Sequence, residues 1–157
     1  ISFHACLPFF ATGSNPGFIL YDLTATVPKK YLENEINVQT LSVSFHPKFP
    51  FVAICLAHFD TMIYNFTTLP PTLQCVLENS PTALFVVFHA HLPVFALGFS
   101  GKPIILYNIE TSPPTIQRYL KEPQWSKGCV SFHPTLALLA TVRDKKPYSV
   151  IIYNLNR

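Results

Sequence analysis

The sequence predicts an all-β protein built from four copies of one strand-rich repeat. The first observation is a Phe-His pair that recurs at intervals of 42, 43 and 44 residues. The four pairs are Phe3-His4, Phe45-His46, Phe88-His89 and Phe132-His133. The second observation is that each copy contains short apolar runs with the length and composition of β-strands. An internal period of this length indicates a repeat architecture.

Three further markers keep the same period. An alanine follows each of these phenylalanines by eight residues, at Ala11, Ala53, Ala96 and Ala140. A tyrosine followed by Asp or Asn comes ten to thirteen residues after the alanine, at Tyr21, Tyr64, Tyr107 and Tyr153. A proline recurs every 43 residues between copies, at Pro28, Pro71 and Pro114. This agreement between markers excludes a chance alignment.

The four strands expected in each copy differ in pattern. In the first, Leu41, Val43 and Phe45 alternate with serines, which is the period of two expected for a strand. The second is almost wholly apolar, as in 51–56 and 136–140, which is typical of a strand covered on both faces. The third ends at the recurring tyrosine, and the fourth follows the recurring proline and is more polar, as an edge strand is. Each copy is therefore predicted to be a four-stranded meander with its second and third strands buried.

The combination of these features resembles the WD repeat. Phe45-His46-Pro47 and Phe132-His133-Pro134 are similar to the turn of that motif, and Leu139-Ala140-Thr141 is similar to its second strand. The resemblance covers essentially the whole chain and implies a β-propeller of four-stranded antiparallel blades. Only four repeats are present, which implies an incomplete ring or half of a larger propeller, because WD-repeat rings usually have about seven or eight blades.

The chain departs from the WD pattern in three ways. The Trp-Asp pair is Tyr-Asp once and Tyr-Asn three times, and the Gly-His dipeptide between repeats is missing. The Asp expected in the turn before the third strand is found clearly only in the second copy, as Asp60, and Asp144 is a second candidate. Packing between sheets is therefore expected, whereas the polar network that normally joins the strands of a WD blade is in doubt.

The predicted organisation is a single propeller segment, 1–157, with blades at about 1–40, 41–83, 84–129 and 130–157. We expect the last blade to lack its outer strand and the first blade to begin inside a strand. Both terminal blades would then expose large apolar faces, which a monomer in solution does not tolerate. Three explanations are open: a longer polypeptide, two chains that join in an eight-bladed ring, or a half-open arc that packs against another subunit.

Composition and charge exclude some classes of partner. Hydrophobic residues make up 49% of the chain and charged residues 12%, against about 25% charged in typical domains. This favours sheets buried on both faces and surface covered by other proteins. The net charge of +3 is small and dispersed, so no nucleic-acid partner is expected. No apolar run approaches the ~20 residues of a membrane helix, so no membrane span is expected.

The four cysteines show no CxxC spacing. They indicate free thiols rather than a disulfide framework. Free thiols favour a reducing intracellular compartment, with the cytoplasm as the first expectation. A virion or another large particle is kept as an alternative location.

The recurring histidines and tyrosines are the most conspicuous candidates for a site. Zinc needs ligand nitrogens about 2.0–2.1 Å from one ion. Packed sheets stand ~10 Å apart, so equivalent histidines in neighbouring blades cannot meet at one metal. Their position after the first strand instead predicts a turn-capping role. The tyrosines are interpreted as packing residues between blades.

No catalytic residue, metal ligand or cofactor is predicted, so the chain is not expected to be an enzyme. It has no Gly-x-Ser-x-Gly elbow and no glycine-rich phosphate loop, and its eight carboxylates are scattered. Binding is expected at the loops that differ between copies. The candidate binding residues are Asn15, Asp60, Lys102, Arg143, Lys145 and Lys146.

The resemblance implies a non-catalytic scaffold that binds other protein subunits within a larger assembly, and the composition agrees with it. The alternative is a structural subunit that is permanently packed into a large complex or a viral particle. Both are arguments at the level of fold class. A homodimer or the remainder of a longer chain is expected to complete the propeller.

Overall fold

The structure is a computed structural model that describes residues 1–13, 17–24, 26–33, 37–78, 80, 82–120, 130–143 and 149–156. Within them, every regular element is a β-strand. The strands are β1 (Ser2–Phe3), β2 (Phe9–Gly13), β3 (Phe18–Asp22), β4 (Lys29–Glu33), β5 (Thr40–Phe45), β6 (Phe51–Leu56), β7 (Thr61–Asn65), β8 (Thr72–Leu77), β9 (Ala83–Phe88), β10 (Val94–Phe99), β11 (Ile104–Asn108), β12 (Thr115–Leu120), β13 (Val130–Phe132), β14 (Leu138–Arg143) and β15 (Ser149–Asn154). In this part of the chain there is no helix long and apolar enough to cross a membrane.

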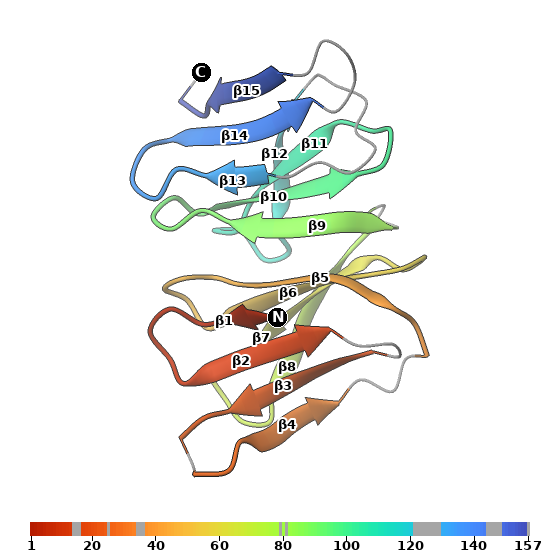
Figure 1. Cartoon of the computed structure of the whole chain (residues 1–157), viewed down its shortest axis with the longest axis vertical. Coiled ribbons are helices and arrows are strands. Elements are labelled where there is room, and N and C mark those ends of the chain that lie inside the picture. Colours follow the sequence, from red (N-terminus) through yellow and green to blue (C-terminus); the bar gives the residue numbers. More distant parts are fainter. Residues whose placement is uncertain are drawn as a thin grey trace.

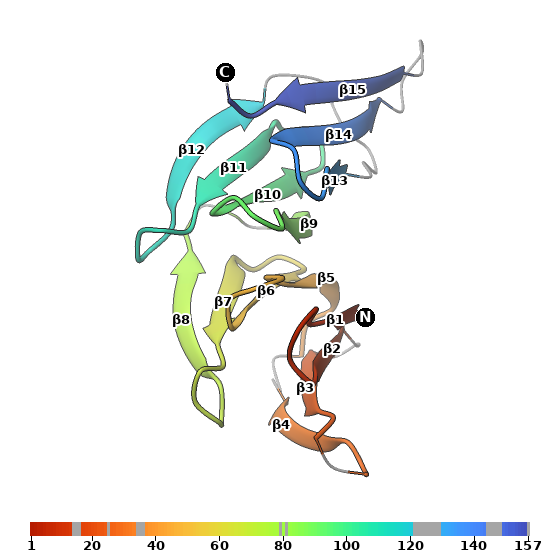
Figure 2. The ribbon, with the colours of Figure 1, turned by 90° about the vertical axis from the view of Figure 1, so that its left-hand side faces the viewer.

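The strands form four antiparallel sheets, each a simple meander in sequence order. Blade 1 is β1-β2-β3-β4, blade 2 is β5-β6-β7-β8, blade 3 is β9-β10-β11-β12, and blade 4 is β13-β14-β15. The blades are stacked along the long axis of the molecule (Figure 1). Figure 2 shows that the stack bends into an arc, with β8 and β12 on one side and the first strands of the blades on the other. This is the predicted all-β fold of four meanders in part of a ring.

Burial along the strands follows the predicted order. All residues of β10 and all but the first of β6 are buried. In the outer strands β8 and β12, only the last residues, Leu77 and Leu120, are buried. The prediction of a covered second strand and an outer edge strand is therefore confirmed in blades 2 and 3.

The prediction of a buried third strand is wrong in blade 4. Strand β15 is exposed at alternate positions, including Val150 and Ile152. These side chains lie on the face of blade 4 that turns away from blade 3, and no described element covers that face. The apolar pattern of a strand therefore indicates a face that a neighbouring blade can cover. The strand is buried only where such a blade is present.

Each joint between blades pairs the same two kinds of face. One face carries a row of three directly opposed residues from the first three strands, such as Phe88, Phe95 and Tyr107 in blade 3. We call it the ladder face. The opposite face of the preceding blade carries the recurring alanine and an aliphatic residue opposite it, such as Ala53 and Ile63 in blade 2. We call it the acceptor face.

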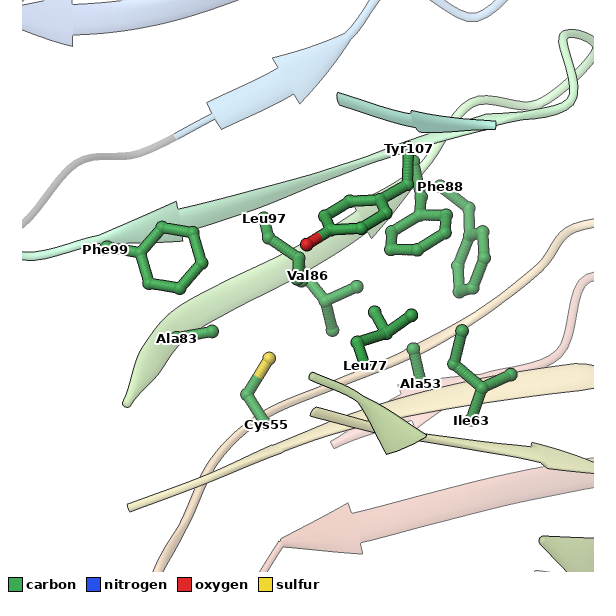
Figure 3. Packing of buried hydrophobic residues seen from close by; sticks show 11 residues of the cluster. Ala53, Cys55, Ile63, Leu77, Ala83, Val86, Phe88, Leu97, Phe99 and Tyr107 are labelled. Atoms are coloured by element: carbon green, nitrogen blue, oxygen red, sulfur yellow. The ribbon is translucent and has the colours of Figure 1, made fainter. Parts of the chain in front are cut away.

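Figure 3 shows the joint between blades 2 and 3. Phe88 and Tyr107 from the ladder face lie over Ala53 and Ile63 from the acceptor face. The same arrangement occurs where the ladder face of blade 2 packs on blade 1, and where that of blade 4 packs on blade 3. The recurring tyrosines belong to these ladder faces, and Tyr64 and Tyr107 are 8% and 4% exposed. The interpretation of the tyrosines as packing residues is confirmed at these joints.

Candidate interaction surfaces

The four recurring histidines hold the turn that follows the first strand of each blade. The Nδ1 atom of each one accepts hydrogen bonds from the backbone N–H groups two and three residues further along, at 2.9–3.2 Å. Each imidazole therefore satisfies two backbone donors that the turn leaves without a strand partner. The predicted turn-capping role is confirmed in all four copies.

The other ring nitrogen ties neighbouring blades together. His4 Nε2 donates to the carbonyl oxygen of Phe49 in blade 2 at 3.3 Å, and His89 Nε2 donates to that of Leu136 in blade 4 at 3.0 Å. In both cases the acceptor lies three residues after the histidine of the next blade. Because Nδ1 accepts two N–H bonds, the neutral ring carries its proton on Nε2, which makes it the donor. Sequence spacing gave no sign of these bonds between blades.

His46 departs from this pattern at the joint between blades 2 and 3. It is 1% exposed, and no described residue accepts a hydrogen bond from its Nε2 atom. Burial lowers the pKa of His46 from 6.5 to about 4, and the charges of His4 and Lys48 act in the same direction. At this joint the two turns are linked instead by Lys48, whose Nζ donates to His91 Nδ1 at 2.8 Å.

The ladder face of blade 1 is open. Phe3, Phe10 and Tyr21 form a row of stacked rings with centroids 5.4 and 4.6 Å apart, and their equivalents in blade 3 form a similar row at 5.3 and 5.1 Å, with the first pair of rings tilted. In blade 3 these rings are buried in the joint. In blade 1 the Phe3 side chain is 65% exposed, and Phe10 and Tyr21 are half-buried.

The acceptor face of blade 4 is open at the other end of the arc. Val150 and Ile152 are 66% and 65% exposed, whereas Ile104 and Leu106 at the equivalent positions of blade 3 are fully buried. Val142 on β14 is also exposed. The arc thus ends in two apolar faces of opposite kind.

A third apolar surface follows the outer strands. Leu73 and Val76 of β8 and Ile116 and Tyr119 of β12 occupy equivalent positions and are 40–53% exposed. We call these four residues the outer stripe. A groove of about 330 Å³ lies between the two strands, with Val76 and Ile116 among its lining residues and Glu78 beside them.

Of the six predicted loop candidates, the structure describes Asp60, Lys102 and the backbone of Arg143, which belong to three different blades. Lys102 is exposed in the turn between β10 and β11, and Asp60 precedes β7. Asn15, Lys145 and Lys146 lie outside the described residues, as does the side chain of Arg143 at the end of β14. A binding role for these six residues therefore stays a prediction.

Asp60 has a structural role in blade 2. Its Oδ1 atom accepts a hydrogen bond from Ser80 N–H at 2.7 Å, and Ser80 Oγ in turn accepts from Thr61 N–H at 2.7 Å and donates to the Leu77 carbonyl at 2.6 Å. Ser80 is fully buried. This network joins the turn before β7 to the segment after β8, so blade 2 has a polar network of its own. Ser80 could not be predicted from the sequence, because no repeated marker falls at that position.

Among the described residues, no group of three or more His, Cys, Asp or Glu side chains is placed to hold a metal ion. The histidine rings are instead engaged with backbone and with aromatic neighbours, such as Phe88 beside His46 at 5.3 Å between ring centroids. The surfaces available for binding are therefore apolar. They are the ladder face of blade 1, the acceptor face of blade 4 and the outer stripe.

Comparison with known proteins shows which known fold the chain shares. No family model and no curated protein matches the chain. Among solved structures, the crystal structure of Saccharomyces cerevisiae Sqt1 is similar over 99% of this chain, with a TM-score of 0.77 and 16% sequence identity. Sqt1 from Chaetomium thermophilum is similar over 98% of the chain, with a TM-score of 0.80 and 16% identity. A chain in the crystal structure of the Mitotic Checkpoint Complex is similar over 99%, with a TM-score of 0.75 and 13% identity.

The chain has the fold of part of a WD40 β-propeller. It spans 44%, 42% and 46% of the three chains that it matches, which is less than half of each. At these identities the likeness concerns the fold alone. The partial propeller agrees with the open ladder and acceptor faces at the two ends of the arc.

Proposed function

We propose that the chain is a non-catalytic scaffold segment of a WD40-type propeller that binds other protein subunits within a larger assembly. The observation that carries the proposal is the outer stripe. Its four apolar side chains are 40–53% exposed on strands that would otherwise face water, and exposed apolar patches of this kind mark interaction surfaces. The fold alone does not specify a function, so the proposal is based on the exposed residues of the outer stripe.

The outer stripe fits an extended or helical segment of a protein partner. Its groove of about 330 Å³ runs between β8 and β12, with Pro113, Pro114 and Tyr107 also in its lining. Prolines and aromatic rings offer a rigid apolar surface at low entropic cost. Among the described residues that line the groove, Glu78 alone is charged. A partner segment with apolar side chains and one basic residue would match it.

The test begins with identification of the partner. The tagged chain is purified from its native cells, bound proteins are identified by mass spectrometry, and the dissociation constant is then measured with purified components. Replacing Leu73 and Tyr119 together by Asp should weaken binding at least tenfold, because both side chains lose their apolar contacts with the partner. Gln117→Asp is the matched control, because Gln117 is an exposed polar residue on the same strand β12. Equal affinity for the stripe variant and the control would refute binding at the outer stripe.

The second candidate is a structural subunit that is permanently packed into a large complex or particle. The hydrophobic content of 49% favours it. The two candidates predict different behaviour of the isolated chain. A scaffold purifies alone with a defined mass, whereas a packed structural subunit aggregates unless its neighbours are co-expressed.

The proposal includes completion of the propeller by further blades, from a second copy of the chain or from a longer polypeptide. The two open blade faces support this part. An intracellular location is also part of the proposal. It is supported by Cys6, Cys55 and Cys75, which form no disulfide among the described residues.

A further inference from the structure

We propose that the ladder face of blade 1 binds the acceptor face of blade 4 in a second copy of the chain, and that two copies close into a head-to-tail ring of eight blades. This inference rests on the proposed completion of the propeller. It is independent of partner binding at the outer stripe, which lies on other strands.

The first argument is that the chain already contains three examples of this interface. At each one a ladder face packs on the acceptor face of the preceding blade. In the joint between blades 3 and 4, for example, Phe132, Leu139 and Tyr153 pack on Ala96 and Leu106. The interface is heterologous, which means that every blade presents one face of each kind.

The second argument is that the two open faces repeat the residue types of the buried ones. Phe3, Phe10 and Tyr21 oppose one another across β1, β2 and β3, as Phe88, Phe95 and Tyr107 do across blade 3. This row is the ladder that a preceding blade would cover.

The open acceptor face shows the same correspondence. Ala140 lies opposite Ile152, as Ala96 lies opposite Leu106 in blade 3. Val150 completes this face at the position of Ile104. The core positions of both open faces carry no charge, whereas Lys30 on the outer strand β4 lies opposite Tyr21 at the edge of the ladder face. The two cores are therefore suited to each other and poorly suited to a polar surface.

The third argument is a hydrogen bond that the pairing would complete. The acceptors for His4 and His89 are the carbonyls of Phe49 and Leu136, each three residues after the histidine of the next blade. Those carbonyls also accept a turn N–H, as the Leu7 carbonyl does from Phe9 at 2.8 Å. The Leu7 carbonyl is therefore the equivalent acceptor in blade 1. The donor in the second copy would be Nε2 of His133, which is exposed, unlike the other three recurring histidines.

The fourth argument concerns closure. A heterologous interface gives a closed ring only if the rotations from each copy to the next add up to a full turn. Otherwise it gives an open fibre. The chain spans 42–46% of the propeller chains that it matches, so slightly more than two such segments equal one of them in length. Two arcs of four blades make eight, which is within the range of about four to eight blades found in propellers.

The first experiment measures the mass of the purified 157-residue chain by multi-angle light scattering and sedimentation over a concentration series. The expected species is a dimer with twice the 17.7 kDa mass of one chain. Phe3→Asp and Ile152→Asp should each weaken dimerisation at least thirtyfold, because each one places a charge in both junctions of the ring. Leu73→Asp is the control, since it alters a similarly exposed side chain on the outer stripe and should remain dimeric.

The second experiment mixes the two variants. In a head-to-tail pair of Phe3→Asp and Ile152→Asp chains, one junction carries both substitutions and the other carries neither. The mixture should therefore recover a dimer that neither variant forms alone. An interface between two identical faces would behave differently, because only one of the two variants would lose the dimer and mixing would restore nothing.

Three results would overturn the proposal: a wild-type chain that stays monomeric at all concentrations, species that grow beyond two copies, or a mixture that stays monomeric. Because Phe3 and Ile152 are each 65% exposed in the single chain, their substitution should leave the circular dichroism spectrum unchanged, which checks that the variants fold. Failure of the scaffold proposal is distinguishable, since partner binding at the outer stripe is measured separately and Ile152→Asp should retain it.

Discussion

At the scale of single residues, the histidines show how one side chain supports both a turn and a joint. His89 accepts two backbone N–H bonds within its own turn and donates one bond to Leu136 in the next blade. His133 accepts the same two bonds but is exposed. Comparing His89 with His133 therefore separates the contribution of the turn to stability from the contribution of the buried joint between blades.

We expect His89→Ala to lower the free energy of unfolding by about 2–4 kcal/mol, because it removes the bond between blades and the acceptor of two turn N–H groups, and opens a cavity where the fully buried ring lies. His133→Ala should cost only about 1 kcal/mol or less, since water can replace its bonds. Denaturant midpoints and m-values of the two variants measure the difference. Equal losses for both would contradict a structural role for the bond between blades.

His46 makes the stability depend on pH. Its pKa is lowered from 6.5 to about 4 in the folded chain, so between these values the unfolded chain binds more protons at this position. Its contribution is therefore fully present above about pH 6.5 and is lost as the pH falls through the folded pKa, by up to roughly 3 kcal/mol.

We expect His46→Gln to flatten this dependence. The measurement is the urea midpoint of the wild-type chain and the variant at pH 7, 5.5 and 4.5. His133→Gln is the control, because this histidine is exposed. A parallel decline in the wild-type chain and in His46→Gln would show that another group causes it.

At the scale of strands, Gly98 and Phe85 show why one position in a buried strand has no side chain. They are cross-strand partners between β9 and β10, and a Cβ atom at Gly98 would lie 1.8 Å from Phe85 Cζ. The phenylalanine ring therefore occupies the space above the glycine, which is a known way to stabilise glycine within a sheet.

We expect Gly98→Ala to destabilise the chain by about 1–3 kcal/mol, since the ring must move out of a packed position. Adding Phe85→Leu should recover part of this loss, because the shorter side chain leaves room for the methyl group. A double-mutant cycle from thermal or denaturant unfolding measures the coupling. Additive effects of the two substitutions would contradict the contact.

The strands were largely predictable because the markers repeat. The Phe-His pair, the alanine and the tyrosine each fix a register position, and the outer strands were recognisable from proline and polarity. A bulge recurs at Tyr21, Tyr64 and Tyr107, where the third strand pairs with the outer strand. The sequence pattern did not predict it, because a bulge leaves the alternation of side chains locally ambiguous.

The hydrogen bonds between blades could not be predicted from the sequence. His4 bonds to a carbonyl 45 residues away and His89 to one 47 residues away, and these pairs depend on how two sheets pack. The network around Ser80 was missed for another reason, since it occurs in one copy and leaves no period to detect. The exposed outer stripe was also missed, because polarity alone marks an edge strand without showing which of its apolar residues reach the surface.

At the scale of the whole molecule, the two open faces connect assembly with stability. If two copies close a ring, unfolding separates them, and the thermal midpoint then depends on chain concentration. We expect the midpoint of the wild-type chain to rise by roughly 2 °C for each tenfold increase in concentration. The midpoint of Ile152→Asp should be independent of concentration, and calorimetry or circular dichroism melts can test both. A wild-type midpoint that does not change with concentration would contradict coupled assembly and folding.

The pairing of a ladder face with an acceptor face has a consequence for how such chains can change in length. Each additional repeat brings one face of each kind, so it covers one open face and leaves a new one of the same type. An arc of any number of blades therefore has one open face of each kind, and gene duplication or loss of a repeat leaves the chemistry of its two ends unaltered. The ends disappear only when they meet each other.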